Sequence, residues 1–247
     1  MQLYLIRHAQ SENNALWART KSENGRSPDP LLTDIGHQQA ATLAKFLTQT
    51  DESSQRDDLD IYNRAGFSFT HLYCSLMERA IQTGTYIAQA KQMPLLVWEM
   101  VHEWGGIYED DYESGEKRGL PGANRAFFAE KYPHLVLPEE LDDTGWWNRP
   151  FEPRDACYGR AQQFLQALHE RHGDSDDQVA IVTHGGFFYS FISALLDNWE
   201  AKAPLPDANQ VWFAVNNASI TRIDFNDTHI RMAYLNRVDF LPTELIT

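Results

Sequence analysis

Two histidines that each follow a short apolar run are the clearest candidates for chemistry in this chain. Residues 3–6 are apolar and lead into Arg7 and His8, and residues 179–183 lead in the same way into His184. Continuous apolar runs of this length are typical of strands that are buried on both faces, as in a parallel sheet. Ligands of open α/β sheets bind beyond the carboxyl ends of the strands. We therefore expect both histidines at the edge of the sheet where such proteins do chemistry.

Other polar residues are expected at the same edge. Arg79 comes shortly after a predicted strand over residues 67–73, and Glu103 follows a short predicted strand over residues 95–97. Arginine binds phosphate through two parallel hydrogen bonds, and helix N-termini offer free N–H donors. A neutral histidine among such groups can attack phosphorus, and a carboxyl group can supply the proton for the leaving group. The residues thus indicate a site for a tetrahedral oxyanion.

Strands and helices alternate along most of the sequence. Further strands are predicted over residues 211–215, 219–225 and 230–235, and helices are predicted after Thr33, after Arg79, over residues 155–172 and after His184. This order predicts a three-layer α/β/α sandwich with a mostly parallel sheet. The close spacing of the last strands favours a hairpin with one antiparallel strand. Residues 12–32 are polar and contain Gly25, Pro28 and Pro30, so we expect them to be irregular.

The segment 104–154 breaks this alternation. It is rich in tryptophan, proline and glycine, and it contains an acidic run. We interpret it as a cap inserted into a single domain that spans residues 1–247. Trp104, Trp146 and Trp147 are expected to build a small core in this cap, and they could also contact a ligand.

The composition excludes several classes of partner. The chain of 247 residues has a formal net charge of −14, with 43% hydrophobic and 23% charged residues. Nucleic acids and anionic membranes need a basic footprint, so we expect neither as a partner. Cys74 and Cys157 are too few for a disulfide framework or a zinc cluster and are interpreted as reduced thiols. Because no secretory signal precedes the first strand, we expect a cytoplasmic location.

One pair of histidines raises the question of metal binding. His169 and His172 lie three residues apart on a predicted helix, where they could bind an ion, but a solvated helix face is the favoured interpretation. The sequence contains no His-Glu-x-x-His motif and no Walker-type glycine loop. We therefore predict no metal and no cofactor.

The segment Leu5-Ile6-Arg7-His8-Ala9-Gln10-Ser11 resembles the Arg-His-Gly-Glu-Thr signature of the histidine phosphatase superfamily, the phosphoglycerate mutase-like enzymes. The resemblance continues in order along the chain through Asn14, residues 32–36 and 75–80, His102-Glu103, and residues 182–186 and 217–221. Ala9 and Gln10 depart from the signature, which has glycine and glutamate at these positions. Neither substitution affects a catalytic atom.

The resemblance implies a role for each matching residue. His8 would be the nucleophile that becomes phosphohistidine, attacking as a neutral imidazole whose other nitrogen is held by an acceptor such as a backbone carbonyl. Glu103 would be the general acid and then the base for water, with Glu99 and Glu109 as alternatives. The transferred phosphoryl group would be held by Arg7, Arg79 and His184 and by the further pocket residues Asn14, Gln10 and Gly185.

Three functions are compatible with this resemblance. The first is a metal-independent phosphomonoester hydrolase that acts on a small molecule. The alternative is a cofactor-dependent phosphotransferase of the phosphoglycerate mutase type, which needs extra cations in the cap. The start of the cap is acidic, which favours the hydrolase, although the cap also contains Lys117, Arg118, Arg125, Arg149 and Arg154. A catalytically inactive interaction module is the third, but such a protein would be expected to lose His8, an arginine or the acid. A homo-oligomer is left open.

Overall fold

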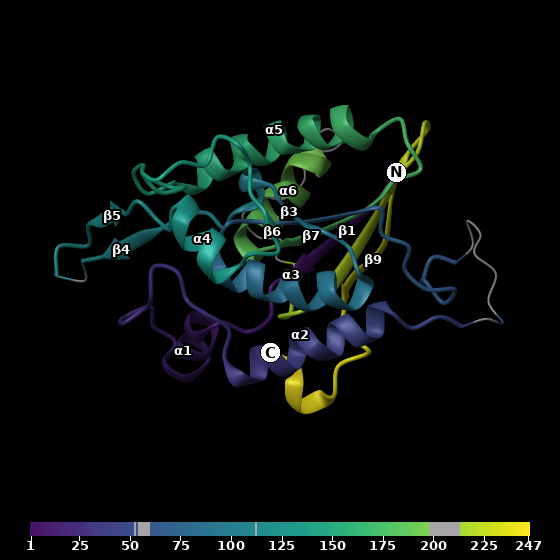
Figure 1. Cartoon of the computed structure of the whole chain (residues 1–247), viewed down its shortest axis with the longest axis horizontal. Helices are drawn as coiled ribbons and strands as arrows, with labels where there is room; N and C mark the ends of the chain where they lie inside the picture. The colour runs from purple at the N-terminus through teal and green to yellow at the C-terminus, as the bar shows by residue number, and fades with distance from the viewer. Residues whose placement is uncertain (52, 54–59, 112, 198–212) are drawn as a thin grey trace.

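The computed structural model describes residues 1–51, 53, 60–111, 113–197 and 213–247. Its centre is a seven-stranded sheet in the order β6-β3-β2-β7-β1-β8-β9 (Figure 1). The strands are β1 (Gln2–Arg7), β2 (His71–Cys74), β3 (Leu95–Val97), β6 (Leu135–Val136), β7 (Gln178–Thr183), β8 (Ile220–Phe225) and β9 (Ile230–Arg237). The first five in the spatial order run parallel, and β8 and β9 form an antiparallel hairpin beside β1. The predicted mostly parallel α/β sandwich is therefore confirmed.

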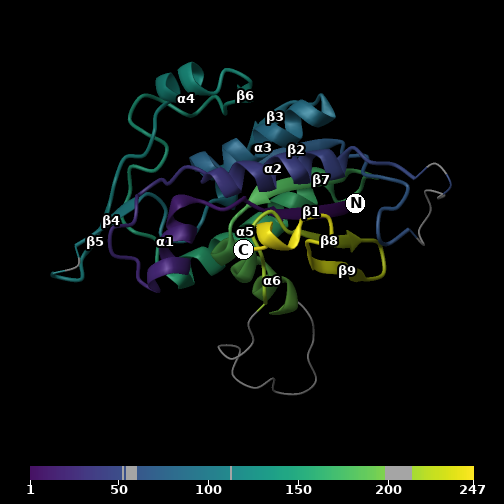
Figure 2. The same ribbon diagram turned by 90° about the horizontal axis from the view of Figure 1, so that it is seen from below.

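Helices cover both faces of this sheet (Figure 2). The helices α2 (Asp34–Leu47) and α3 (Glu78–Lys91) lie on one face, and α5 (Arg154–His172) and α6 (Gly185–Asp197) lie on the other. Each face has its own apolar core, with Leu43 and Ile81 in the first and Phe164 and Phe191 in the second, all fully buried. Burying one large apolar side chain contributes about 1.5–3 kcal/mol, so these two cores stabilise β1 and β7 at the centre of the fold.

The expectation that residues 12–32 are irregular is wrong for their first half, which forms α1 (Glu12–Thr20). The Ser11 side chain accepts a hydrogen bond from the Asn14 backbone N–H, and the Asn14 side chain accepts one from the Ser11 backbone N–H. This reciprocal capping box satisfies two backbone donors at the start of the helix. The helix ends at Lys21, whose φ of 53° is left-handed.

Two strand predictions also need correction. The second strand begins at His71 rather than at residue 67, because Phe67 and Phe69 instead pack against the ring of Tyr4, with ring centroids 5.7 and 5.1 Å away. The strand predicted over residues 211–215 falls partly outside the described residues, and residues 213–215 form no strand.

The segment 104–154 is only partly separate from the sheet. It contains the hairpin β4 (Tyr108–Asp110) and β5 (Lys117–Gly119), followed by α4 (Arg125–Lys131) and then by β6, which pairs with β3 at the edge of the main sheet. The expected separate core of the cap is not found, because the buried Trp146 and Trp147 belong to the core on the α3 side and Trp104 packs against the core on the other face. Two short 3-10 helices, η1 (Glu99–Val101) and η3 (Thr243–Leu245), complete the described elements. No helix in the described ranges is long and apolar enough to cross a membrane.

Candidate active site

Two histidines and an arginine meet at the carboxyl end of the central strands. Because β1 and β7 are parallel neighbours with Arg7 opposite Thr183, the next residues, His8 and His184, leave the sheet at the same level. Their ring centroids are 5.0 Å apart. Arg79, in the first turn of α3, places its Nε 3.2 Å from His8 Nε2. Residues that are far apart in the sequence therefore form one buried cluster.

The hydrogen bonds of His8 determine which ring nitrogen carries its proton. Nδ1 lies 2.7 Å from the backbone carbonyl oxygen of Ala9, which can only accept a hydrogen bond. Nε2 faces the Arg79 Nε–H, which can only donate. We therefore assign the proton to Nδ1 and the lone pair to Nε2. This is the arrangement expected for a nucleophile whose second nitrogen is held by a backbone carbonyl.

The surroundings of both histidines favour their neutral forms. Burial, together with the charges of Arg79 and Arg7, lowers the pKa of His8 well below its usual value. Burial also lowers the pKa of His184, with further contributions from Arg79 and from His8 itself. A neutral imidazole keeps a lone pair for attack, whereas an imidazolium does not.

The groups around His8 are held by further contacts. His184 Nε2 lies 2.7 Å from the hydroxyl of Ser75. The Arg7 guanidinium donates to the carbonyl oxygen of Val215, while its Nε is buried without a protein partner in the described part of the chain. Arg79 Nη1 lies 3.6 Å from Asp29. Burial raises the pKa of Asp29 to about 7, although the charge of Arg79 opposes this shift.

Glu103 binds the N-terminus of α6, the helix that follows His184. Its Oε1 accepts hydrogen bonds from the backbone N–H groups of Trp104 and Phe187, both 2.9 Å away, and its Oε2 accepts one of 3.0 Å from Gly186. A Cβ atom at Gly186 would lie 2.4 Å from Glu103 Oε1, so only glycine allows this approach. The alternative acids lie elsewhere, because Glu99 pairs with Arg149 and Glu109 pairs with Arg118.

The remaining predicted pocket residues are placed at or beside the site. Asn14 lines the cavity, and its Oδ1 accepts hydrogen bonds from Ser11 and from Asn217 Nδ2. Gln10 also lines the cavity and accepts a 2.7 Å hydrogen bond from the Thr33 hydroxyl. A Cβ atom at Gly185 would lie 3.5 Å from Arg7 Nε, so this position is close to the Arg7 guanidinium.

A cavity of about 540 Å³ opens above these residues. Its inner wall includes His8, Arg79 and Glu103. Its outer wall is formed by α1, the chain that follows α1 and the start of segment 104–154, including Trp17, Lys21, Glu23, Arg26, Trp104 and Tyr108. The cavity is large enough for a small organic phosphate.

Several residues of the site were not predicted. Asn217 donates a hydrogen bond of 3.0 Å to the His8 carbonyl oxygen, and Ser75 contacts His184. The Arg26 guanidinium stacks on the Tyr108 ring, 3.9 Å from its centroid. Ser75 and Asn217 lie in sequence motifs that match the superfamily, so they could have been predicted as site residues. Asp29 and Arg26 lie in a segment that was expected to be irregular and that carries no such motif.

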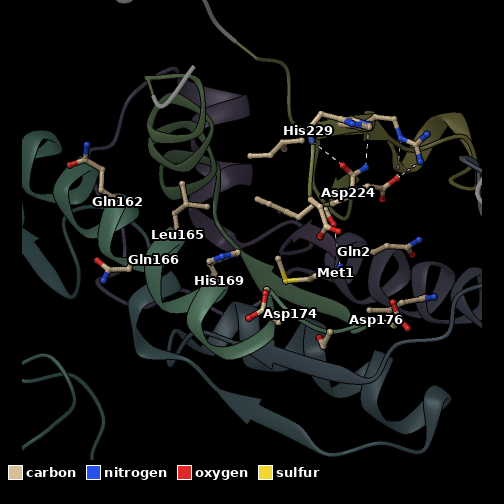
Figure 3. Close-up of a pocket in the computed structure, with 18 residues that line it drawn as sticks. Met1, Gln2, Gln162, Leu165, Gln166, His169, Asp174, Asp176, Asp224 and His229 are labelled. Carbon is tan, nitrogen blue, oxygen red and sulfur yellow. Dashed lines mark hydrogen bonds and ion pairs between the residues drawn. The ribbon is translucent and has the colours of Figure 1, made fainter. Parts of the chain in front are cut away.

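A second, larger groove of about 1570 Å³ lies at the opposite end of the sheet (Figure 3). It is lined by the C-terminal half of α5, the loop after it and the β8–β9 hairpin, including His169, Asp174 and Asp224. None of the predicted site residues lines this groove.

A sequence model of the histidine phosphatase superfamily (branch 1) matches residues 3–55 and 62–238. The chain belongs to this superfamily. Residues 3–238 include all five groups proposed for catalysis, namely Arg7, His8, Arg79, Glu103 and His184.

Relatives of this histidine phosphatase superfamily member include mutases. A 2,3-bisphosphoglycerate-dependent phosphoglycerate mutase of Treponema pallidum is 30% identical over 132 residues. The match covers 53% of this chain and 41% of the mutase, so the chain aligns with less than half of that relative.

Solved structures with the same fold include several phosphatases. The alpha-ribazole phosphatase from Shigella flexneri is 22% identical, with a TM-score of 0.58 and 96% of each chain covered. A phosphoserine phosphatase from Entamoeba histolytica, solved with phosphoserine, is 19% identical, with a TM-score of 0.56 and coverage of 98% and 99%. A mycobacterial glucosyl-3-phosphoglycerate phosphatase is 18% identical, with a TM-score of 0.56 and coverage of 96% and 99%. At these identities the likeness concerns the fold.

Proposed function

We propose that this protein is a phosphomonoester hydrolase that acts through a phosphohistidine on His8 and needs no metal for the reaction. The observation that carries the proposal is the orientation of His8. Its Nδ1 is held by the Ala9 carbonyl, and its Nε2 lone pair points toward Arg79. Phosphoryl transfer depends mainly on positioning and on electrostatic stabilisation. Buried arginine and histidine side chains can supply both.

The proposed reaction has two displacements. In the first, His8 Nε2 forms a bond to phosphorus while the ester P–O bond breaks, and Glu103, acting as the general acid, gives a proton to the leaving oxygen. In the second, Glu103 takes a proton from water, whose oxygen attacks phosphorus as the P–Nε2 bond breaks. Arg7, Arg79 and His184 would hold the phosphoryl oxygens, with Asn14, Gln10 and the Gly185 backbone N–H as further donors. The fixed donors need no reorganisation during either step.

The charge distribution of the cap supports hydrolysis rather than mutase activity. Lys117 and Arg118 on β5 form ion pairs with Asp110 and Glu109 on β4. Arg125 donates to the carbonyl oxygens of Pro138 and Leu141. These cations of the cap are thus already engaged and are not placed to bind a second phosphate.

Mutase activity remains a second candidate because of one other observation. Lys21 and Arg26 line the outer part of the cavity together with Glu23. Two cations in the lining of the same cavity as His8 would suit a substrate with a second anionic group. The T. pallidum relative, a bisphosphoglycerate-dependent mutase, also keeps this candidate open.

The test is a trapping experiment combined with a substrate panel. A phosphorylated substrate labelled at phosphorus should leave an acid-labile, alkali-stable label on the wild-type protein. His8→Ala should remove the label, whereas His71→Gln, a matched change of a histidine at the other end of the sheet, should keep it. Label on a serine or cysteine would contradict the proposal.

The panel separates the two candidate reactions. We expect inorganic phosphate to be released from monoesters, with the rate unchanged after exhaustive chelation. Interconversion of phosphoglycerate isomers that depends on added bisphosphoglycerate and exceeds the hydrolysis rate would instead assign the protein as a mutase. Loss of activity on chelation, restored by a divalent ion, would refute the metal-free mechanism.

A further inference from the structure

A second cluster of histidines lies at the amino-terminal end of the parallel strands. It contains His71, the first residue of β2, His172, the last residue of α5, and Asp177, directly before β7. One Asp177 oxygen lies 2.8 Å from His172 Nδ1, and the other lies 3.5 Å from His71 Nδ1. The two imidazole rings meet edge to face at 4.7 Å. His172 is therefore not on a solvated helix face, as the sequence had indicated, but is 2% exposed, whereas His169 is exposed.

We propose that His71, His172 and Asp177 form a binding site for a divalent transition metal of the zinc class. One ligand atom from each residue lies within 4.8 Å of the other two. Two imidazole nitrogens and one carboxylate oxygen are a ligand set that zinc prefers, and three protein ligands leave a position for water. This site is independent of the function proposed above.

The cluster needs only small movements to accept an ion. Zinc bonds of about 2.0–2.2 Å in tetrahedral geometry place ligand atoms roughly 3.3–3.5 Å apart. The 3.5 Å separation of His71 Nδ1 and Asp177 Oδ1 already agrees with this value, whereas the 2.8 Å contact of His172 Nδ1 with Asp177 Oδ2 would lengthen slightly. The His71 side chain is 35% exposed and is held at Nδ1 by the Thr70 hydroxyl, 2.9 Å away. It can therefore rotate toward the ion once this contact is released.

A buried tyrosine orients the central ligand. The Tyr73 hydroxyl lies 3.2 Å from His172 Nε2, on the side of the ring opposite to Asp177. With Nδ1 bound to metal, the Nε2–H would donate to this hydroxyl. Metal-bound histidines are commonly oriented by such a contact at their other nitrogen. The cluster thus has both the ligands and the support that a metal site needs.

One nearby cation limits the expected affinity. The Arg171 guanidinium stacks on Trp98, 4.2 Å from the ring centroid, and its charge contributes to lowering the pKa of His172 after the larger effect of burial. It would also repel a metal ion, while Asp177 would attract it. We therefore expect micromolar rather than tighter binding.

The bound ion would stabilise the fold by linking three elements. It would join the end of α5 to the starts of β2 and β7, and a ligand that binds only the folded state stabilises that state. The six residues of β7 separate this end of the sheet from His184 by roughly 20 Å at about 3.3 Å per residue. The ion would therefore change stability without taking part in the reaction at His8.

The test measures zinc and cobalt binding to the intact, chelator-treated protein by equilibrium dialysis, together with thermal unfolding. We expect one ion per chain, and saturation at about 100 times the dissociation constant should raise the Tm by roughly 5–10 °C. His71→Gln should weaken binding at least tenfold. Tyr73→Phe, which keeps the ring but removes the hydroxyl, should weaken it about tenfold. Magnesium should not bind, because it prefers six oxygen ligands.

Matched controls decide whether the ion occupies this cluster. His169→Gln, on the same helix but outside the cluster, should bind zinc like the wild type. Because His172 is buried and its replacement could unfold the protein, the half-exposed His71 is the diagnostic position. Equal binding in the wild type and His71→Gln, no saturable binding in the wild type, or loss of binding in His8→Ala would each overturn the proposal.

Discussion

The two ends of the central sheet each bring two histidines together, but in opposite electrostatic surroundings. His8 and His184, at the carboxyl end, lie beside Arg79, which lowers the pKa of both after the larger effect of burial. His71 and His172, at the amino-terminal end, share the carboxylate of Asp177. The first arrangement keeps a nitrogen lone pair available among cations, where an anion is attracted. The second presents an anionic ligand set, where a cation is attracted.

The pKa values of the aspartates at the two ends are shifted in opposite directions. Burial raises the pKa of Asp29, beside Arg79, to about 7. Burial also raises the pKa of Asp177, but hydrogen bonds from His172, Ser175 and Thr70 outweigh it and lower the value to about 2. The surroundings therefore favour the protonated form of Asp29 and the charged form of Asp177. Burial dominates at Asp29, whereas the hydrogen bonds from His172, Ser175 and Thr70 outweigh burial at Asp177.

The largest effect that would test this comparison is expected at Glu103. General acid catalysis is worth about 10²–10⁴-fold, and a proton matters most for a poor leaving group. Glu103→Gln should therefore slow alkyl phosphate hydrolysis by about that factor and nitrophenyl phosphate hydrolysis much less. The matched variant Glu99→Gln removes a carboxylate that pairs with Arg149 at the surface, and it should have little effect on either substrate. Steady-state kinetics on both substrates would check this, and an equal loss on both would assign the acid role to another residue.

A somewhat smaller loss of kcat is expected when Arg79, at the carboxyl end, is replaced, and almost none when Arg171, at the other end, is replaced. Arg79→Ala removes a buried donor beside His8, and loss of one such donor costs roughly 10²–10³-fold in kcat. Arg171→Ala removes an arginine that stacks on Trp98 at the other end, and kcat should change less than about twofold because this residue touches no proposed phosphate ligand. Comparable losses in the two variants would mean that the cations at the carboxyl end have no special role.

The last effect concerns the stability of the fold rather than the rate of the reaction, and it depends on pH. Between the usual pKa of an aspartate, 3.8, and about 7, the folded protein holds a proton on Asp29 that the unfolded chain lacks. Wild-type stability therefore falls as pH rises through this range, by up to about 1.4 kcal/mol per pH unit from this group. Asp29→Asn cannot lose that proton, so its stability relative to the wild type should rise from pH 4 to 7 and stay constant above pH 7.

Urea unfolding at several pH values measures this difference, with Asp227→Asn as a control on an exposed turn. A stability difference between Asp29→Asn and the wild type that does not change with pH would show that Asp29 is charged throughout, as Asp177 is expected to be.

Local patterns in the sequence determined most of the fold and much of the site. The apolar runs before His8 and His184 predicted two buried parallel strands, and such strands necessarily deliver their next residues to one edge. A helix was predicted to begin after Thr33, and the Thr33 side chain caps α2 by accepting a hydrogen bond from the Gly36 N–H. The family was recognisable because its motifs occur in order along the chain.

Tertiary structure alone decided which distant side chains meet. The helix α1 was missed because its start depends on a capping box between Ser11 and Asn14 rather than on an apolar stripe. Asp29 reaches Arg79, fifty residues away, only because the loop after α1 folds over α3. The sequence pattern placed His172 with His169 on one face of a helix. In the structure, the end of α5 instead places His172 against Asp177 and against His71, about a hundred residues earlier. Periodicity describes the neighbours along one element, whereas contacts between elements depend on how the sheet orders its strands.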